Sequence, residues 1–274
     1  MKNWIALVIL LLGFTAEART LLVSDVDDTI KLAHVKDITE AIRFSRDDVS
    51  RFAGMNALYD LIVNDQPDLE IVYLSNAPNW LMGNTHRRFL LNGKFPSGTY
   101  IPRTDLSADF HKLTHLRRLI NEVKPDKVIL LGDNGERDAE FYNKISLEFA
   151  HKPIQFYQFI RIVYSNNFMD FQAARPLGQQ VGFVTPLEVS FELEKAGLLT
   201  SSSVQWMIDN FAQSILMAPS YSAGASSFMA NGDVVFPYFV NCRDLAWSWD
   251  DSLSRFAIMK DVKGRIFDRC KLKP

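Results

Sequence analysis

The chain has 274 residues, of which 47% are hydrophobic and 12% aromatic, so it can build a large core and is not a disordered protein. Its net charge of −2 and isoelectric point near 6.2 leave no electrostatic footprint for nucleic acid, and we predict no nucleic-acid partner. No internal repeat or low-complexity tract interrupts the sequence.

The N-terminus has the pattern of a signal peptide. A positive start is followed by the apolar run Ile5–Phe14 and by the small-residue pattern Ala16-Glu17-Ala18. The run is shorter than the roughly 20 residues that span a bilayer. We therefore predict cleavage after Ala18, no transmembrane segment in the mature protein, and a periplasmic or secreted location. In such an oxidising compartment Cys242 and Cys270 could pair or remain separate thiols, and their spacing leaves both possibilities open.

Short apolar runs alternate with helical stretches through the first 160 residues. The runs predict four buried strands, at Leu21–Ser24, Ile71–Leu74, Val128–Leu131 and Ile154–Ile160. Two amphipathic stretches between them predict helices, one with Phe52, Met55, Tyr59 and Ile62 on one face, the other capped by Ser107 and carrying Leu113, Leu116, Ile120 and Val123. This order predicts an α/β fold with a doubly wound, Rossmann-like parallel sheet between two helical layers.

The C-terminal part predicts fewer elements. Thr185-Pro186-Leu187-Glu188 is a capping box with proline in the first turn, and Gly197 is a plausible end for that helix. Ser202 with Gln205 predicts the start of a second helix, and Val234–Val240 predicts a strand. These helices are expected to pack on the sheet, and the region by itself indicates no function.

Polar residues follow three of the predicted strands. Asp25 and Asp27 come directly after the first one, in a D-x-D-x-T pattern. Two carboxylates placed there can divide phosphoryl transfer, one attacking phosphorus and the other handling protons. Each polar group alone has an ordinary explanation as a turn, a helix cap or a solvated side chain. Together they predict one site at the carboxyl edge of the sheet, with the further candidates Ser75, Asn76, Lys112, Asp133 and Asp138.

These motifs resemble those of the haloacid dehalogenase superfamily of phosphohydrolases. Three longer strings narrow the resemblance to the catalytic domain of the actin patch-associated phosphatidate phosphatases: Ser24-Asp25-Val26-Asp27-Asp28-Thr29-Ile30-Lys31, Tyr73-Leu74-Ser75-Asn76-Ala77-Pro78 and Gly132-Asp133-Asn134-Gly135-Glu136-Arg137-Asp138. Ile160-Arg161 is also similar. The resemblance implies a haloacid dehalogenase-like catalytic core over residues 19–165, after a signal peptide at 1–18 and before a C-terminal extension over residues 166–274.

The resemblance also implies a role for each candidate. Asp25 is expected to be the nucleophile that forms an aspartyl-phosphate, and Asp27 the general acid and base. Mg²⁺ is expected on the Asp25 and Asp133 side chains and the Asp27 carbonyl oxygen, with Asp138 orienting the metal shell or Lys112. Phosphoryl oxygens are expected on Ser75, Asn76 and Lys112. Asp28 is expected to be structural, and crowding of the acids is expected to favour protonated Asp27.

The substrate is left open between two classes. The spacings between motifs leave no room for a large folded cap, which suits a lipid phosphate at a membrane surface. Trp80, Leu81 and Met82 could form an apolar lip beside the site, or could begin a helix and face the core, which is the slightly favoured interpretation. The alternatives to a lipid phosphatase are an extracytoplasmic phosphatase of soluble phosphomonoesters, such as nucleotides or sugar phosphates, and a non-catalytic phosphate-binding scaffold.

Overall fold

The structure is a computed structural model, and it describes residues 19–104, 110–164, 174–218, 233–236, 247, 249 and 251–271. The predicted signal peptide and Cys242 lie outside the described residues, as does the side chain of Cys270. The export signal and the cysteine pairing therefore stay predictions. In the part of the chain that is described, no helix is both long and apolar enough to cross a membrane.

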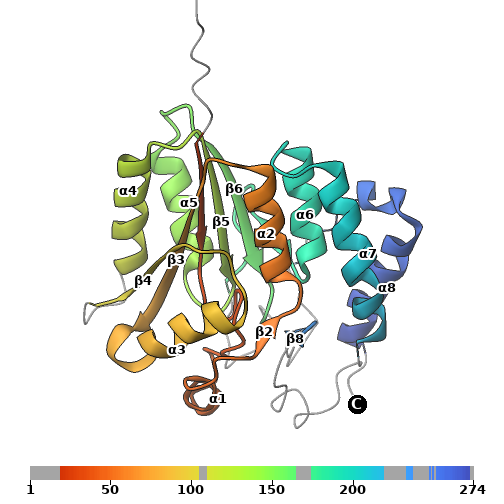
Figure 1. Ribbon diagram of the computed structural model, residues 1–274, viewed down its shortest axis with the longest axis horizontal. Helices are drawn as coiled ribbons and strands as arrows, with labels where there is room; N and C mark the ends of the chain where they lie inside the picture. Colours follow the sequence, from red (N-terminus) through yellow and green to blue (C-terminus); the bar gives the residue numbers. More distant parts are fainter. Residues whose placement is uncertain are drawn as a thin grey trace, which may run out of the picture.

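A six-stranded sheet forms the centre of the molecule (Figure 1). All its neighbouring strands pair in parallel, in the order β4-β3-β1-β5-β6-β7. The strands are β1 (Thr20–Ser24), β3 (Leu69–Pro78), β4 (Thr99–Arg103), β5 (Lys127–Asp133), β6 (Gln155–Arg161) and β7 (Val181–Phe183). Ser24 at the end of β1 pairs with Tyr73 of β3 and Leu131 of β5, so the carboxyl ends of these three strands adjoin.

Helices cover both faces of the sheet, which confirms the predicted three-layer α/β fold (Figure 1). One layer packs α2 (Met55–Asp65) against α6 (Pro186–Lys195) and α7 (Ser201–Met217). The other layer contains α4 (His111–Val123) and α5 (Asp138–Glu148), and α3 (Asn79–Asn92) lies against β3 and β4. The remaining elements are α1 (Ile38–Phe44), a short sheet of β2 (Arg51–Phe52) with β8 (Asp233–Val234), the 3₁₀ helix η2 (Asp251–Arg255), and α8 (Ala257–Lys271), which packs on α7.

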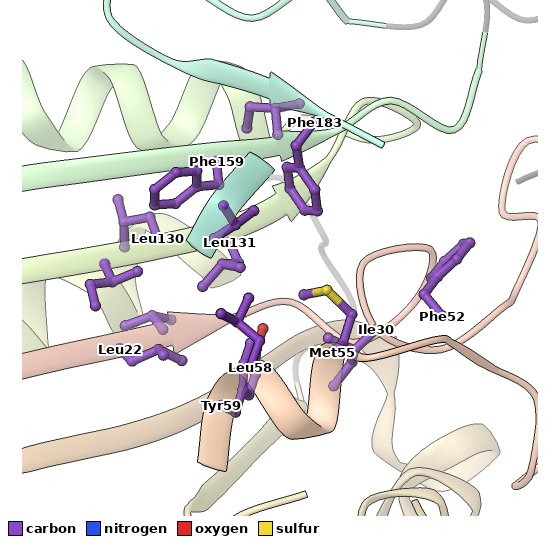
Figure 2. Close-up of a cluster of buried hydrophobic side chains, with 14 of the residues drawn as sticks. Leu22, Ile30, Phe52, Met55, Leu58, Tyr59, Leu130, Leu131, Phe159 and Phe183 are labelled. Atoms are coloured by element: carbon purple, nitrogen blue, oxygen red, sulfur yellow. The ribbon is translucent and has the colours of Figure 1, made fainter. Parts of the chain in front are cut away.

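The core lies between β1, β5, β6 and helix α2. Figure 2 shows Leu22, Leu130 and Phe159 from the strands packed with Leu58 of that helix. The middle residues of β1 and β5 are apolar and buried because helices cover both faces, as expected for a parallel sheet. Tyr59 of α2 connects this core to the carboxyl end of β1, since its hydroxyl donates a hydrogen bond of 2.7 Å to Ser24 Oγ.

A buried arginine joins the sheet to the loop after β1. The Arg161 guanidinium lies between the rings of Phe52 and Phe183, 4.2 and 4.6 Å from their centroids. It donates to the carbonyl oxygens of Thr29 (2.8 Å) and Val184 (2.7 Å), and burial lowers its pKa to about 9. The end of β6 therefore fixes both the D-x-D-x-T loop and the chain that leads into α6.

The four predicted strands are confirmed as β1, β3, β5 and β6, but some details are wrong. Phe52 is buried in β2 rather than on a helix, because the chain turns at Gly54, whose φ is +78°, before α2 begins. The predicted cap Ser107 lies outside the described residues, and α4 starts at His111 after Phe110. Three strands were not predicted, β2, β4 and β7, because all three are short.

Of the three elements predicted in the C-terminal part, helix α6 agrees best with its prediction, and α7 and β8 differ in their bounds. Helix α6 begins with the expected Thr185 capping box, and Gly197 follows its end with φ at +66°. Helix α7 is capped by Thr200 instead of Ser202, because the Thr200 side chain accepts the Ser203 N–H. The strand predicted over residues 234–240 shortens to β8, and residues 237–240 lie outside the described part. Because β7 belongs to the central sheet, residues after 165 contribute to that sheet, while the domain boundaries themselves stay a prediction.

Candidate active site

The loop after β1 holds Asp25 next to β5. The Asp25 N–H donates to the Leu131 carbonyl (2.8 Å), and the N–H groups of Ile30 and Lys31 close a tight turn on the Val26 carbonyl. Thr29 Oγ1 donates to Asp25 Oδ2 at 3.2 Å. The Asp25 carboxylate is thereby held in a buried position at the carboxyl end of the central strand, as the sequence predicted.

Asp28 organises the same loop from the opposite side. Its φ of +57° turns the chain, and its Oδ1 accepts the N–H groups of Ala33 and His34 at 2.9 and 2.8 Å. Its Oδ2 accepts the Val35 N–H (2.8 Å) and the Tyr164 hydroxyl (2.5 Å). These four hydrogen bonds hold the loop and its support together, which agrees with the structural role expected for Asp28.

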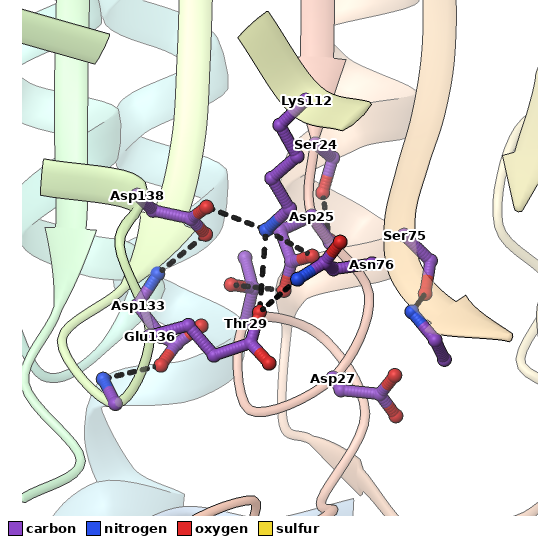
Figure 3. A network of polar contacts seen from close by, with 12 residues as sticks. Ser24, Asp25, Asp27, Thr29, Ser75, Asn76, Lys112, Asp133, Glu136 and Asp138 are labelled. Atoms are coloured by element: carbon purple, nitrogen blue, oxygen red, sulfur yellow. Dashed lines mark hydrogen bonds and ion pairs between the residues drawn. The ribbon is translucent and has the colours of Figure 1, made fainter. Parts of the chain in front are cut away.

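Lys112 connects Asp25 to Asp138 (Figure 3). Its Nζ lies 2.7 Å from Asp25 Oδ1 and 2.5 Å from Asp138 Oδ1, and Glu136 Oε2 follows at 4.0 Å. Burial alone would lower the pKa of Lys112, but Asp138 and Asp25 outweigh burial and raise that pKa well above its usual value. Lys112 is therefore a fixed positive charge at the bottom of the site.

Asp25, Asp133 and Asp138 form a buried acidic cluster. Each offers a side-chain oxygen within 4.8 Å of the other two. Burial and the neighbouring acids raise the pKa of Asp25 and of Asp133 well above the usual value, with Lys112 acting in the opposite direction. Gly132 permits the close approach, because a Cβ there would lie 2.5 Å from Asp138 Oδ2. Crowded carboxylate oxygens suit a hard divalent cation, so the residues fit a metal site.

Asp27 contacts a histidine that the sequence analysis did not identify. His86 of α3 is fully buried, with Nε2 3.1 Å from Asp27 Oδ1 and Nδ1 2.8 Å from the Tyr100 hydroxyl. Burial alone would raise the pKa of Asp27, but His86, together with Lys31 and Lys112, outweighs burial and lowers that pKa. The expectation that crowding favours protonated Asp27 is therefore wrong, because the groups that act on the pKa of this carboxylate are His86, Lys31 and Lys112 rather than the other acids. Crowding acts instead on Asp25 and Asp133.

A pocket of about 220 Å³ opens beside the two motif acids. Arg103 Nε donates to the Asn76 carbonyl at 2.7 Å, and Asn76 Nδ2 donates to Glu136 Oε2 at 3.5 Å. Ser75 is fully buried, and its Oγ accepts the N–H of the pocket residue Ala77 at 3.0 Å. Alongside Asp25 and Asp27, the lining residues are Ala33, Val35, Ala41, Asn76, Ala77, Pro78, Met82, Arg103 and Glu136.

Trp80 and Leu81 lie in the first turn of α3, at the side of this pocket. They are 83% and 52% exposed, so the favoured prediction that they face the core is wrong. The inward face of α3 is formed instead by Thr85, His86 and Phe89. Trp80 lies on the outer face of the helix, where it contributes nothing to the core.

Three residues of the site were missed for different reasons. Glu136 lies between Asp133 and Asp138 in the same motif, and its acidic side chain was a usable signal. His86 is a polar residue three positions before Phe89 on the buried side of a helix, which was a weaker signal. Arg103 ends β4, a strand that was not predicted, and no pattern marked it.

Comparison with known proteins gives one matching family and one curated relative. The sequence model described as "Phosphatidate phosphatase APP1, catalytic domain" matches residues 20–161. Phosphatidate phosphatase APP1 of Saccharomyces cerevisiae is 28% identical over 148 residues, which are 50% of this chain and 25% of the yeast protein. The chain thus matches only a quarter of its relative's length.

Two solved structures of the Pnkp1/Rnl/Hen1 RNA repair complex also match. Both have 14% sequence identity to this chain and cover 53% of it. The matches cover 43% and 47% of those chains, with TM-scores of 0.35 and 0.34.

Proposed function

Because the chain belongs to the family of phosphatidate phosphatase APP1 catalytic domains, we propose that it hydrolyses phosphate monoesters through an aspartyl-phosphate on Asp25. One observation carries the proposal. Asp25 and Asp27 line the same pocket, and Lys112 lies 2.7 Å from the Asp25 carboxylate. A scaffold that only binds phosphate has no need of two acids in this arrangement, so the non-catalytic alternative is disfavoured.

In the first step a carboxylate oxygen of Asp25 attacks phosphorus, and the bond from phosphorus to the ester oxygen breaks. Asp27 gives a proton to the departing oxygen, which leaves as an alcohol. Since His86 Nε2 lies 3.1 Å from Asp27 Oδ1, the pair can hold that proton between them before it is transferred. In the second step water attacks the phosphoryl group, Asp27 takes the water proton, and Asp25 is released as a carboxylate.

Positive charge must balance the anionic phosphoryl group. Lys112 supplies one charge, and Arg103 at the pocket wall is placed to supply another. We propose Mg²⁺ on the side chains of Asp25 and Asp133 and the Asp27 carbonyl oxygen, where it would offset the charge of the acids and the phosphoryl group. Asp138 then holds Lys112, which agrees with its 2.5 Å contact. The phosphate contacts expected of Ser75 and Asn76 remain part of this proposal.

We propose a lipid phosphate related to phosphatidate as the substrate. The family name supports it, and so does a pocket bordered by single helices, α1 and α3, within the described residues. The test is phosphate release with Mg²⁺, comparing phosphatidate in mixed micelles with nucleotides and sugar phosphates. Faster turnover of a soluble ester than of phosphatidate would contradict the lipid substrate and favour soluble phosphomonoesters. No phosphate release from any ester would contradict the phosphatase activity itself.

An extracytoplasmic site of action is a further proposal. Only the pattern of residues 1–18 supports it. Expression of the full chain in a bacterium, followed by fractionation and N-terminal sequencing, tests it. We expect a mature N-terminus at Arg19 in the exported fraction, and retention of an intact Met1 in the cytoplasm would contradict the proposal.

A further inference from the structure

Two helices beside the pocket expose large apolar side chains to water. Helix α1 exposes Ile38 (77%) and Ile42 (69%), and the first turn of α3 exposes Trp80 and Leu81. Such residues normally lie in a core or an interface, and apolar side chains gathered around a site indicate an interaction surface. We call these four residues the apolar rim.

The apolar rim borders the entrance to the site. Ala41, one residue before Ile42, lines the pocket with Asp25 and Asp27, and so do Pro78 and Met82 on either side of Trp80 and Leu81. In Figure 1, α1 and α3 both lie at the lower end of the molecule, beyond the carboxyl end of β1. Whatever covers the rim therefore also faces the pocket.

Charge indicates what covers the rim. Among the residues of α1 and α3, all of which are described, the charged side chains are Arg43, Arg87 and Arg88 against the single acid Glu40. Glu40 is half-buried, whereas the three arginines are exposed. Arg43 pairs with Glu40 at 3.7 Å and Arg88 with Asp48 at 2.7 Å. When the chain flanking α1 is included, the basic side chains of this surface (Lys36, Arg43, Arg46, Arg87 and Arg88) outnumber its acids (Asp37, Glu40, Asp47 and Asp48) by one. Exposed ion pairs of this kind contribute little, so the arginines remain able to contact an anionic surface, which complements them.

Tryptophan and isoleucine together with arginine are the combination found on helices that lie in a membrane interface. The apolar side chains insert between headgroups while arginines contact anionic lipid. We propose that α1 and the first turn of α3 dock on an anionic membrane surface through the apolar rim. The inference rests on the proposed function, because it gives a lipid phosphate a direct path from the bilayer to Asp25.

Vesicle binding tests the docking surface separately from catalysis. The full chain is sedimented with phosphatidylcholine vesicles containing phosphatidylglycerol, neither of which is a phosphate monoester. We expect the double variant I42Q/W80Q to bind roughly tenfold or more weakly than wild type, since binding scales with inserted apolar area. The matched control is L147Q, which replaces a residue that is 68% exposed at the far end of α5 and should bind as wild type does.

Hydrolysis of a small soluble chromogenic phosphate is measured on the same proteins. Equal rates for wild type and I42Q/W80Q show that the variant is folded and that its defect is in docking. The proposal would be overturned if wild type does not sediment with the vesicles, or if the double variant binds them as well as wild type does. So would a dimer that I42Q/W80Q dissociates, because the rim would then belong to a second copy. Normal vesicle behaviour without hydrolysis of any ester would instead defeat the proposed function.

Discussion

His86 Nε2 lies 3.1 Å from Asp27 Oδ1, so the second acid of the D-x-D-x-T motif is tied to a helix that begins more than 50 residues later in the chain. Tyr100 contacts the other nitrogen of the same ring at 2.8 Å. The position of Asp27 is therefore set by β4 and α3 as well as by its own loop. A proton-transferring group is effective only when it is held in place, which gives His86 a role in the reaction.

Replacing His86 tests that role. We expect His86→Ala to lower kcat by roughly tenfold or more while KM changes little, because the groups that bind phosphate are untouched. His86 lowers the pKa of Asp27, so its loss should raise that pKa and move the alkaline limb of the kcat/KM profile, where Asp27 loses the proton that it donates, to higher pH. Tyr100→Phe removes only the outer hydroxyl and should have a smaller effect. An increase in KM at unchanged kcat would contradict the positioning role.

The nucleophile is tested by Asp25→Asn. This change should abolish turnover, because the amide cannot form the aspartyl-phosphate, and Asp27→Asn should reduce turnover severely. Wild type incubated with a phosphate-labelled ester and quenched in acid should retain label that Asp25→Asn lacks. Beryllofluoride should inhibit wild type by imitating the phosphorylated carboxylate. Full activity of Asp25→Asn would exclude this residue as the nucleophile.

Asp133 should couple metal binding to stability. Burial, Asp138 and Asp25 raise its pKa above the value in the unfolded chain, so the folded state holds the proton more tightly. That contribution to stability is present below the unfolded pKa and is lost as pH rises through the folded pKa. Chelator-treated wild type should therefore melt at a lower temperature at neutral than at mildly acidic pH.

Asp133→Asn separates the two roles of this side chain. The variant should lose activity and depend less on pH in its melting temperature, because the amide carries no charge and its oxygen can still accept the Gly135 N–H. Added Mg²⁺ should raise the melting temperature of wild type more than that of the variant. Identical pH dependence of the two metal-free proteins would show that Asp133 does not carry the effect, and full activity of wild type in excess EDTA would refute a metal requirement.

Asp28 should matter for stability more than for chemistry. In Asp28→Asn an amide N–H₂ replaces an oxygen that accepts buried N–H or O–H groups, and each buried group left unpaired costs about 1–3 kcal/mol. Tyr164→Phe removes one donor and leaves the three backbone contacts, so it should cost less. Urea unfolding measures both, with kcat of the folded fraction alongside. Unchanged stability together with lost activity would assign Asp28 to the reaction instead.

Much of the fold was predictable because its signals are local. The buried strands β1 and β5 need apolar residues on both faces, so Leu21–Ser24 and Val128–Leu131 could be identified without any partner. The Thr185 capping box is also a local pattern, in which one side chain and the backbone three residues later satisfy each other. Short strands such as β4 and β7 carry no such signal, because neighbouring strands stabilise them.

The candidate acids were likewise predictable from the sequence alone, because Asp25, Asp27 and Asp133 follow buried strands whose carboxyl ends meet at one edge of a parallel sheet. Only the tertiary structure decided which of them lie next to which partner. Asp27 contacts His86, and Asp25 contacts Lys112. The contact with His86 makes the pKa shift of Asp27 opposite in direction to the expected one. The rotation of α3 about its own axis, set by the packing of Phe89, placed His86 inward and Trp80 outward. Contacts and electric fields depend on distances in space, which a linear order of residues does not contain.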